Sequence, residues 1–248
     1  MNHDGRTSVS FEDVSKSFGA KKILSDVSFQ VAAGEALCIL GRSGTGKSVT
    51  LKLLIALLRP DAGKIWIEQD EITNLRSEDL SRVRRKMGFL FQDAALFDSI
   101  TVYENLALPL ARLTDKSQNE IDFMVDKVLR QVGLAADKKT MPSELSGGMR
   151  KRAGLARALV LEPKILLADE PSSGLDRITA SEIDELLLQQ KTERQTTLIV
   201  VTHDVHGARR VGDRFAVFDK GQLVSHGTAA EVEHSDNRTA RELISIPC

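Results

Sequence analysis

Residues 41–48 form a glycine-rich octet whose residue types could bind phosphate. The octet consists of Gly41, Arg42, Ser43, Gly44, Thr45, Gly46, Lys47 and Ser48. The glycines let successive backbone N–H groups point at phosphate oxygens, Lys47 adds a positive charge, and Ser48 can give an oxygen to Mg²⁺. The octet therefore predicts a site for a nucleoside triphosphate with magnesium. A surface turn that matches by chance is the alternative.

The residues on either side of the octet favour the phosphate site. Residues 35–40 are a short apolar run typical of a buried strand, and residues 47–58 have the apolar-rich pattern of a helix that ends before Pro60. Strand, loop and helix in this order place the helix N-terminus against the anion. The use that the protein makes of the triphosphate is a separate question.

Two carboxylates follow another apolar strand. Residues 164–168 lead directly into Asp169 and Glu170. Asp169 is placed to hold Mg²⁺ directly or through water, and Glu170 to polarise a water molecule for attack on the γ-phosphate. Paired acids before a proline can also be a mere turn, but the preceding phosphate loop favours the catalytic interpretation.

A second glycine-bearing segment precedes a basic helical stretch. Its members are Leu145, Ser146, Gly147, Gly148 and Met149. The serine hydroxyl and the free N–H groups of this helix start could also meet phosphate, yet one triphosphate does not need two such cradles on one chain. In isolation, a helix cap with a tight turn is the favoured explanation.

Composition restricts the class of protein. The chain of 248 residues can form one large domain or one domain with an insertion. Its 34 basic and 35 acidic residues give a formal net charge of −1, which argues against a nucleic-acid partner. We interpret the basic runs 82–86 and 150–152 as solvated helix faces. The apolar runs are far shorter than the roughly 18 residues of a membrane helix.

The cysteines and the N-terminus suggest a compartment. Cys38 and Cys248 make no disulfide framework, which fits a reducing environment. Cys38 lies in an expected strand and is predicted to be a small buried hydrophobe. Residues 1–10 contain no apolar signal segment. We therefore expect a cytosolic protein that could dock on a membrane protein.

The order of patterns predicts an α/β protein with a helical insertion. Strands are expected at residues 8–14, 23–31, 38–40, 64–67, 87–91, 164–168, 197–201 and 214–218. Helices are expected at residues 47–58, 121–132, 177–190 and 205–211, with capping boxes at residues 117–120 and 228–231. We predict one domain, with a nucleotide-binding core at 1–91 and 163–230, a helical subdomain at 92–162 and a C-terminal tail at 231–248.

Together, these motifs resemble those of the ATP-binding cassette (ABC) ATPase family. The sequence LSGGM at residues 145–149 precedes ADEPSSGLD at residues 168–176, so that the P-loop, signature and Walker B segments occur in family order. The resemblance covers essentially the whole chain. It implies a P-loop NTPase core with an N-terminal antiparallel β-subdomain and an inserted helical subdomain. It also implies a homodimer in which each signature closes over the ATP on the other P-loop.

The resemblance gives roles to further positions. Phe18 falls where the family places an aromatic ring against adenine, and a core phenylalanine is the alternative. Gln92 is at the Q-loop position, which contacts Mg²⁺ and senses the transporter partner. Asp176 matches the key acid of the loop through which the cassettes communicate, although Arg177 stands where many relatives have proline. His203 matches the switch histidine at the γ-phosphate.

The implied site thus has several groups of residues. Catalysis is assigned to Glu170, His203 and Lys47; nucleotide binding to Phe18, Gly41, Arg42, Ser43, Gly44, Thr45, Gly46, Lys47, Ser48, Val49 and Gln92; Mg²⁺ binding to Ser48, Gln92 and Asp169; contact in trans to Leu145, Ser146, Gly147, Gly148 and Met149; and contact between dimer loops to Asp176. Because Glu170 is not replaced by Gln or Ser, we expect active ATP hydrolysis.

Further details resemble the Mla/Mkl group of ABC ATPases. They are Met149, where amino-acid and metal importers usually carry Gln, the segment 91–110, and the sequences LSGGMRKRAGLARAL and LDRITA. The group serves lipid transport across the bacterial envelope with an MlaE-like permease and MCE-domain proteins. This implies a peripheral position on the cytoplasmic face of the inner membrane.

The same resemblance implies contact surfaces. Residues 93–113 would line a groove for a coupling helix of the permease, although their apolar members could also simply build the core of the helical subdomain. Residues 231–248 would contact a small STAS-type accessory subunit, or form an ordinary surface helix. Two other functions stay open: an ATPase for a polar-solute importer or exporter, and a soluble ABC protein that acts on nucleic acid or the ribosome. The near-zero net charge and the single cassette weigh against the last.

Overall fold

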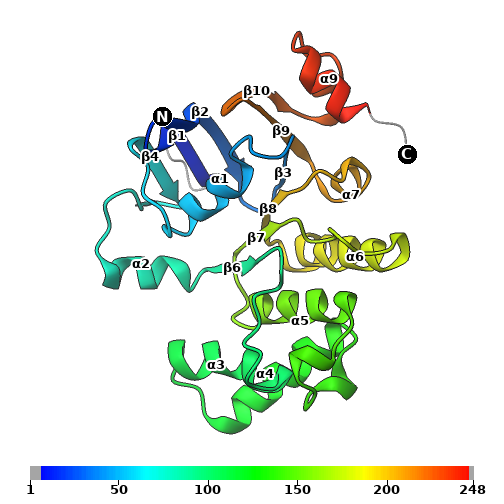
Figure 1. Cartoon of the computed structure of the whole chain (residues 1–248). Helices are drawn as coiled ribbons and strands as arrows, with labels where there is room; N and C mark the ends of the chain where they lie inside the picture. The colour runs from blue at the N-terminus through cyan, green and yellow to red at the C-terminus, as the bar shows by residue number, and fades with distance from the viewer. Residues whose placement is uncertain (1–6, 246–248) are drawn as a thin grey trace.

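The structure is a computed structural model that describes residues 7–245 (Figure 1). The interpretations of residues 1–6 and of Cys248 lie outside this range. The described residues form two β-sheets, with helices on both faces of the larger one. Within the same range, the helices are too short or too polar for any of them to span a bilayer.

The larger sheet has six strands in the order β10-β9-β3-β8-β7-β6. They are β3 (Ala36–Gly41), β6 (Met87–Leu90), β7 (Ile165–Asp169), β8 (Thr197–Val201), β9 (Arg214–Asp219) and β10 (Gln222–Gly227). β10 runs antiparallel to β9, and all other neighbours are parallel. Every residue of β3, β7 and β8 is buried, as expected for parallel strands that are covered on both faces.

Side chains of the central strands alternate between two hydrophobic cores. Along β3, Leu37 and Ile39 enter one core, whereas Cys38 and Leu40 enter the other. Cys38 is fully buried, its Sγ donates to the Ala208 carbonyl at 3.5 Å, and burial raises the pKa of its thiol to about 12. The prediction that Cys38 is a small buried residue is confirmed.

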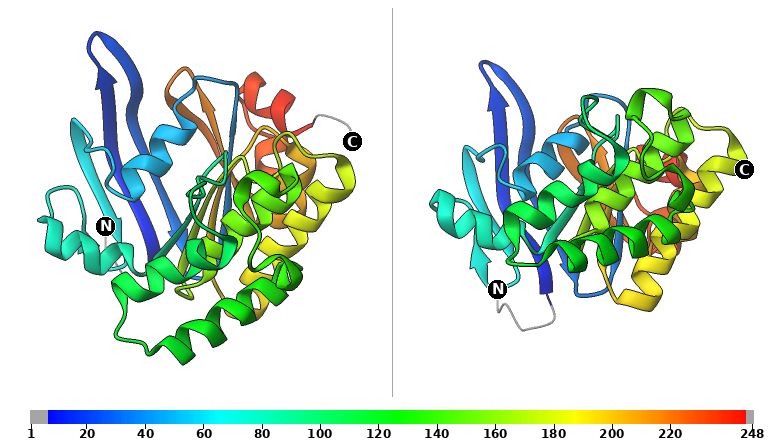
Figure 2. Two further views of the ribbon diagram at one scale, coloured as in Figure 1. Left: turned by 60° about the horizontal axis from the view of Figure 1, so that its bottom comes forward. Right: turned by 90° about the horizontal axis from the view of Figure 1, so that it is seen from below.

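The smaller sheet is antiparallel and has the order β2-β1-β4-β5. Its strands are β1 (Thr7–Phe18), β2 (Lys21–Ala32), β4 (Ala62–Ile67) and β5 (Asp70–Glu71). This sheet shares one core with α1 (Lys47–Leu54) and with one face of the central sheet. Figure 2 shows α1 between the two sheets. The predicted N-terminal antiparallel subdomain is therefore present.

Helices fill the stretch between β6 and β7. They are α3 (Val102–Leu113), α4 (Gln118–Gln131) and α5 (Gly147–Leu159), with 3₁₀ turns at Ala135–Asp137 and Pro142–Glu144. The predicted capping box between Ser117 and Glu120 opens α4, and Gly133 follows this helix with a left-handed φ of 70°. These green helices lie below the central sheet in Figure 1. Residues 92–162, all of them described, contain no strand, and the limits of the subdomain stay a prediction.

The other helices are α2 (Ser77–Arg84), α6 (Arg177–Arg194), α7 (Val205–Val211), α8 (Ala229–Glu233) and α9 (Arg238–Ile244). The predicted capping box of Thr228 and Glu231 starts α8. Val232 of α8 and Ile244 of α9 are fully buried in the core that α5 also enters. The described part of the C-terminal tail is thus packed against the domain.

Two expectations about helices were wrong. The helix expected at residues 47–58 ends at Leu54, because Ala56 takes a left-handed φ of 52° and the Leu57 N–H returns to the Lys52 carbonyl at 2.9 Å, which is a helix-ending arrangement. The basic run 150–152 is not a solvated face. Lys151 is only 7% exposed, because its side chain turns inward toward the turn after β7.

Candidate nucleotide-binding and hydrolysis site

The P-loop joins β3 to α1 at the carboxyl edge of the central sheet. Gly44 and Gly46 have φ angles of 80° and 102°, which side chains rarely adopt. A Cβ atom at Gly46 would also lie only 2.9 Å from the Ile23 carbonyl oxygen. The Lys47 ammonium donates to the carbonyls of Gly41 at 2.7 Å and Arg42 at 3.0 Å, so the loop curls around its own lysine. This curled backbone suits the phosphates of a nucleotide.

Ser48 and Asp169 meet across the gap between the P-loop and β7. The Ser48 hydroxyl donates to Asp169 Oδ1 at 3.0 Å. Burial raises the pKa of Asp169, against the effect of this hydrogen bond. Burial also lowers the pKa of Lys47, while the carboxylates of Glu170 and Asp169 oppose that change. A hydroxyl and a carboxylate oxygen beside a phosphate loop fit Mg²⁺, which prefers a few protein oxygens together with substrate phosphates.

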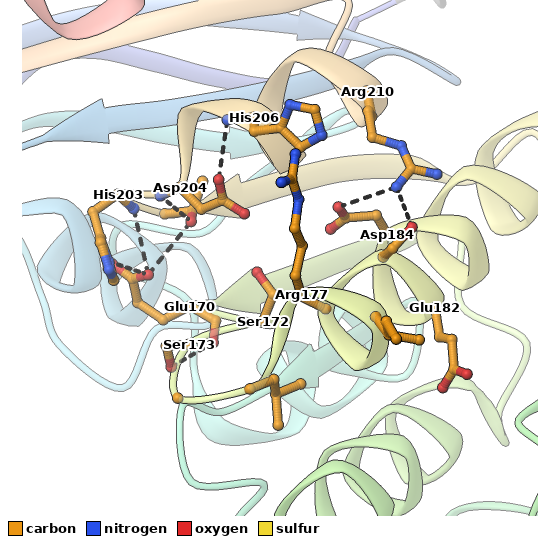
Figure 3. Close-up of a pocket in the computed structure, with 16 residues that line it drawn as sticks. Glu170, Ser172, Ser173, Arg177, Glu182, Asp184, His203, Asp204, His206 and Arg210 are labelled. Carbon is orange, nitrogen blue, oxygen red and sulfur yellow. Dashed lines mark hydrogen bonds and ion pairs between the residues drawn. The ribbon is translucent and has the colours of Figure 1, made fainter. Parts of the chain in front are cut away.

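Glu170 and His203 form the second polar pair of this edge (Figure 3). Glu170 Oε2 lies 2.8 Å from His203 Nδ1 and 3.4 Å from the His203 backbone nitrogen. Thr202, which is buried, also points its hydroxyl at the same Oε2 at 3.4 Å. One carboxylate oxygen therefore has several donors around it. The sequence had not singled out Thr202, because a threonine at a strand end is ordinary.

An open hollow of about 810 Å³ lies beside this pair. Glu170 and His203 line one side, and Asp184 and Arg210, from α6 and α7, line another (Figure 3). Asp176, at the start of α6, accepts from the backbone N–H groups of Ile178 at 3.0 Å and Thr179 at 3.1 Å. Asp176 therefore acts as the N-cap of α6 in this structure, and its role between two cassettes stays a prediction.

Phe18 and Gln92 are both accessible. Phe18 ends β1 and is 48% exposed, which rules out the alternative of a core phenylalanine. The Lys16 ammonium lies 5.7 Å from the centroid of the Phe18 ring. Gln92 is exposed on the turn that follows β6. Val49 is half-buried and packs against the core that α1 shares with the smaller sheet.

The signature segment lies on the other side of the central sheet from the P-loop. Ser146 is the N-cap of α5, and its hydroxyl accepts from the Met149 N–H at 3.2 Å. A Cβ atom at Gly148 would come within 2.5 Å of the Thr179 methyl group, so a larger residue there would displace the Thr179 side chain. α5 packs in one core and α1 in the other. In the described range, no hydrogen bond joins the signature to the P-loop, and the two cradles of one chain stay apart.

One further residue of this site was missed from the sequence. The buried Lys151 ammonium of α5 donates to the Glu170 carbonyl at 2.9 Å and to the Ser173 hydroxyl at 3.3 Å. The sequence shows only three successive basic residues, Arg150 to Arg152, and carries no signal that the middle one turns inward.

Comparisons with known proteins agree with this arrangement. The sequence model of the ABC transporter family matches residues 24–173. The probable ribonucleotide transport ATP-binding protein Mkl of Mycobacterium leprae is 43% identical over 246 residues, covering 98% of this chain and 71% of that protein. The methionine import ATP-binding protein MetN 1 of Bacillus cereus is 40% identical over 228 residues, covering 90% of this chain and 66% of that protein.

Solved structures show the same fold. The dimeric, post-hydrolysis cassette MJ0796 bound to ADP and Pi is similar with a TM-score of 0.83 and 32% identity, covering 89% of this chain and 98% of that one. CbiO1 of Clostridium perfringens is similar with a TM-score of 0.82 and 27% identity, covering 96% and 99%. The family match, these relatives and the paired polar groups at the sheet edge together show that the chain belongs to the ABC transporter family, as an ATP-binding cassette that hydrolyses ATP with Mg²⁺.

Proposed function

We propose that the chain is the ATPase subunit of a lipid transporter of the bacterial envelope. It works as a homodimer on the cytoplasmic face of the inner membrane, with an MlaE-like permease and an MCE-domain protein. The observations that support the lipid class are Met149, the segment 91–110 and the sequence LDRITA, through which the chain resembles the Mla/Mkl group. No nucleic-acid partner is proposed, in keeping with the formal net charge of −1.

The proposed hydrolysis mechanism uses two polar pairs, Ser48 with Asp169 and Glu170 with His203. The P-loop N–H groups and Lys47 hold the phosphates, and Ser48 with Asp169 and Gln92 would hold Mg²⁺, which offsets negative charge on the reacting phosphate. Glu170 accepts a proton from the attacking water through its carboxylate, and His203, 2.8 Å away, fixes the direction of that carboxylate. The Glu170–His203 contact is the observation that carries this mechanism.

Replacement of Glu170 tests the mechanism. Glu170→Gln keeps the size of the side chain and removes the basic oxygen, so ATP hydrolysis should fall by about 10²- to 10³-fold. Binding of a fluorescent ATP analogue should persist, because the P-loop is unchanged. Phosphate release and analogue binding, measured on the same preparation, check both statements. Turnover at the parent's rate would show that Glu170 is not the base.

An apolar groove supports the proposed contact with a permease. The groove has a volume of about 360 Å³ and lies between β6 and α3, where Phe97, Leu108 and Leu113 line it. Phe97 and Leu113 are 54% and 40% exposed, although both side chains are large and apolar. Such a face fits an amphipathic helix of the permease.

The loop that carries Phe97 is held by Asn105, whose side chain is fully buried. The Asn105 amide accepts from the Phe97 N–H at 2.8 Å and donates to the carbonyls of Phe97 and Thr101 at 3.1 and 3.0 Å. The groove wall is thus preformed, which lowers the entropy that docking would cost.

The C-terminal tail is the proposed contact for a STAS-type accessory subunit. Its helix α9 already buries Ala240 and Ile244 against the domain. The exposed side chains of Arg238 and Glu242 on the same helix form an ion pair at 2.6 Å. The outer face of α9 is therefore polar, which fits a small, exchangeable accessory subunit better than a permanent one.

Transport of a polar solute is the second candidate, since the two relatives carry the names of ribonucleotide and methionine transport proteins. Affinity purification from membranes, with identification of the subunits and lipids that co-elute, separates the candidates. An MlaE-like permease with bound phospholipid supports lipid transport. A permease with a periplasmic solute-binding protein, and ATPase stimulation by a polar solute but not by phospholipid, would replace it with the second candidate.

A further inference from the structure

The carbonyl group of Glu170 receives two hydrogen bonds from neighbouring side chains. Lys151 Nζ donates to it at 2.9 Å, and the Ser173 hydroxyl donates to it at 3.0 Å. Lys151 also donates to that hydroxyl at 3.3 Å, which closes a small ring of three groups. Lys151 is 7% exposed, so water competes little for these contacts.

The backbone that this ring holds is strained. Glu170 has a left-handed φ of 49°, a conformation that costs a residue other than glycine on the order of 1 kcal/mol. Its N–H group is fixed by the Val201 carbonyl at 2.8 Å. With the N–H held by β8 and the carbonyl by Lys151, both ends of the residue are defined. The direction of the Cα–Cβ bond follows, and with it the direction in which the carboxylate meets His203.

The helix that carries Lys151 is itself anchored elsewhere. Arg157 of α5 donates to the carbonyls of Ala94 at 3.1 Å and Ala95 at 2.5 Å, and both alanines also have left-handed φ angles, 59° and 51°. Gly154 lets the helix approach this turn, because a Cβ atom there would lie 2.7 Å from that of Ala94. These contacts fix the position of α5 and therefore the position of Lys151 on it.

A lysine is a costly choice for a purely structural contact at this place. Burial lowers the pKa of Lys151, opposed by the carboxylates of Asp93, Glu170 and Asp169. An apolar side chain of similar size would avoid the desolvation cost of the ammonium. At this position the Lys151 ammonium donates to the Glu170 carbonyl and interacts electrostatically with the three carboxylates.

We propose that Lys151 is a positioning residue for hydrolysis, which sets the orientation of the Glu170 carboxylate by holding the Glu170 carbonyl from α5. The proposal rests on the proposed role of Glu170 as the base. Lys151 acts through the backbone of Glu170, to whose carbonyl its ammonium donates.

The test compares Lys151→Met with Lys151→Arg in the full chain. Misplacement of the base by a fraction of an ångström to one ångström should lower kcat of the methionine variant by about 10- to 100-fold. The KM for ATP and the affinity for a fluorescent ATP analogue should stay within about two-fold of the parent, because the P-loop is intact. Arginine keeps a cationic donor and should recover part of kcat. Lys139→Met, at an exposed lysine of the helical insertion, is the matched control and should behave as the parent.

Combining Lys151→Met with Glu170→Gln distinguishes a positioning role of Lys151 from a general structural effect. In single-turnover measurements, adding Lys151→Met to Glu170→Gln should lower the residual rate no further, because there is no base left to orient. Ser173→Ala, which removes the other donor, gives a second route if the methionine variant folds poorly; it should lower kcat less, and also only when Glu170 is present.

Three results would overturn the proposal: an unchanged kcat for both Lys151→Met and Ser173→Ala, a loss of nucleotide affinity as large as the loss of kcat, or a full further decrease in the Glu170→Gln background. If Glu170→Gln itself hydrolysed ATP normally, the proposed base would fail first. If Glu170→Gln is inactive while both Lys151→Met and Ser173→Ala hydrolyse ATP normally, only the inference about Lys151 fails.

Discussion

Asp184 is a buried carboxyl group that the hydrolysis mechanism does not use. It lies on α6, 4.0 Å from the Arg210 guanidinium, and faces α7, where the nearest Oδ atom would be 2.9 Å from a Cβ placed on Gly207. Burial raises the pKa of Asp184 from 3.8 to about 6; Asp204 adds to this, and Arg210 and His206 oppose it. The folded chain thus binds a proton at this site more tightly than the unfolded chain does.

The sign of the pH effect follows from that difference. Between pH 3.8 and about 6 the native state holds the proton longer, so the free energy of unfolding decreases as the pH rises through this window. Asp184→Asn removes the titration and should be more stable than the parent at pH 7.5, by up to about 3 kcal/mol. The gain should shrink as the pH is lowered toward 4. Urea unfolding at pH 5.0 and 7.5 measures it. Asp115→Asn, at an exposed position, should show no such trend, and an equal gain at both pH values would refute the explanation.

Motif residues were predictable because the backbone fixes their positions. The P-loop after β3, the acids Asp169 and Glu170 at the end of β7 and His203 after β8 all lie at the ends of neighbouring parallel strands, so topology alone brings their side chains to one edge. Lys151 was not predictable. Arg150, Lys151 and Arg152 are alike in type, and only the packing of α5 beneath the turn after β7 decides which of them is buried.

At the scale of elements, the groove between β6 and α3 offers a direct test of the permease contact. Phe97→Asp places a charge in the groove and should abolish co-purification of the permease, because the desolvation of a carboxylate opposes helix docking. Fold stability should change little, since Phe97 is already 54% exposed. Pull-down from detergent-solubilised membranes measures the contact.

Phe123→Asp is the matched control for this experiment. Phe123 lies on α4 outside the groove and is 65% exposed. The Phe123→Asp variant should still co-purify with the permease. Retention of the permease by both variants would exclude the groove as the docking site, and loss in both would point to a general effect of added charge.

Element types were mostly predictable, and their ends less so. The strand pattern at residues 8–14 and the capping box before α4 are local signals, and both elements are present, although β1 extends over Thr7–Phe18. The C-terminal end of α1 could not be predicted, because it depends on a residue distant in sequence. Arg84 donates to the carbonyls of Ile55 at 2.9 Å and Ala56 at 3.0 Å, which the shortened helix leaves free. β10 was also missed, since its pairing with β9 leaves a half-exposed strand of weak apolar character.

For the whole molecule, the separation of the P-loop from the signature makes association with a second chain testable. With Glu170→Gln, ATP and Mg²⁺ should produce a species of twice the chain mass, because bound nucleotide then joins the P-loop of one chain to the signature of the other without being consumed. Light scattering coupled to size exclusion measures the mass. Adding Ser146→Arg should keep the chain monomeric by filling the signature cradle, and ADP in place of ATP serves as the control. A monomer with bound ATP would contradict the composite site.

The rate at which Cys38 reacts with a thiol reagent can report on motion around the central sheet. Its thiol lies on β3 between β8 and β9, is fully buried and has a pKa raised to about 12. Its Sγ donates to the Ala208 carbonyl of α7, so a thiol reagent can reach it when α7 moves away from the sheet. In a Cys248→Ser variant, the rate of alkylation at Cys38 therefore reports how often this packing opens. If ATP slows this alkylation, the ratio of the rates without and with ATP measures how much nucleotide bound at the edge of the sheet stabilises the packing around Cys38.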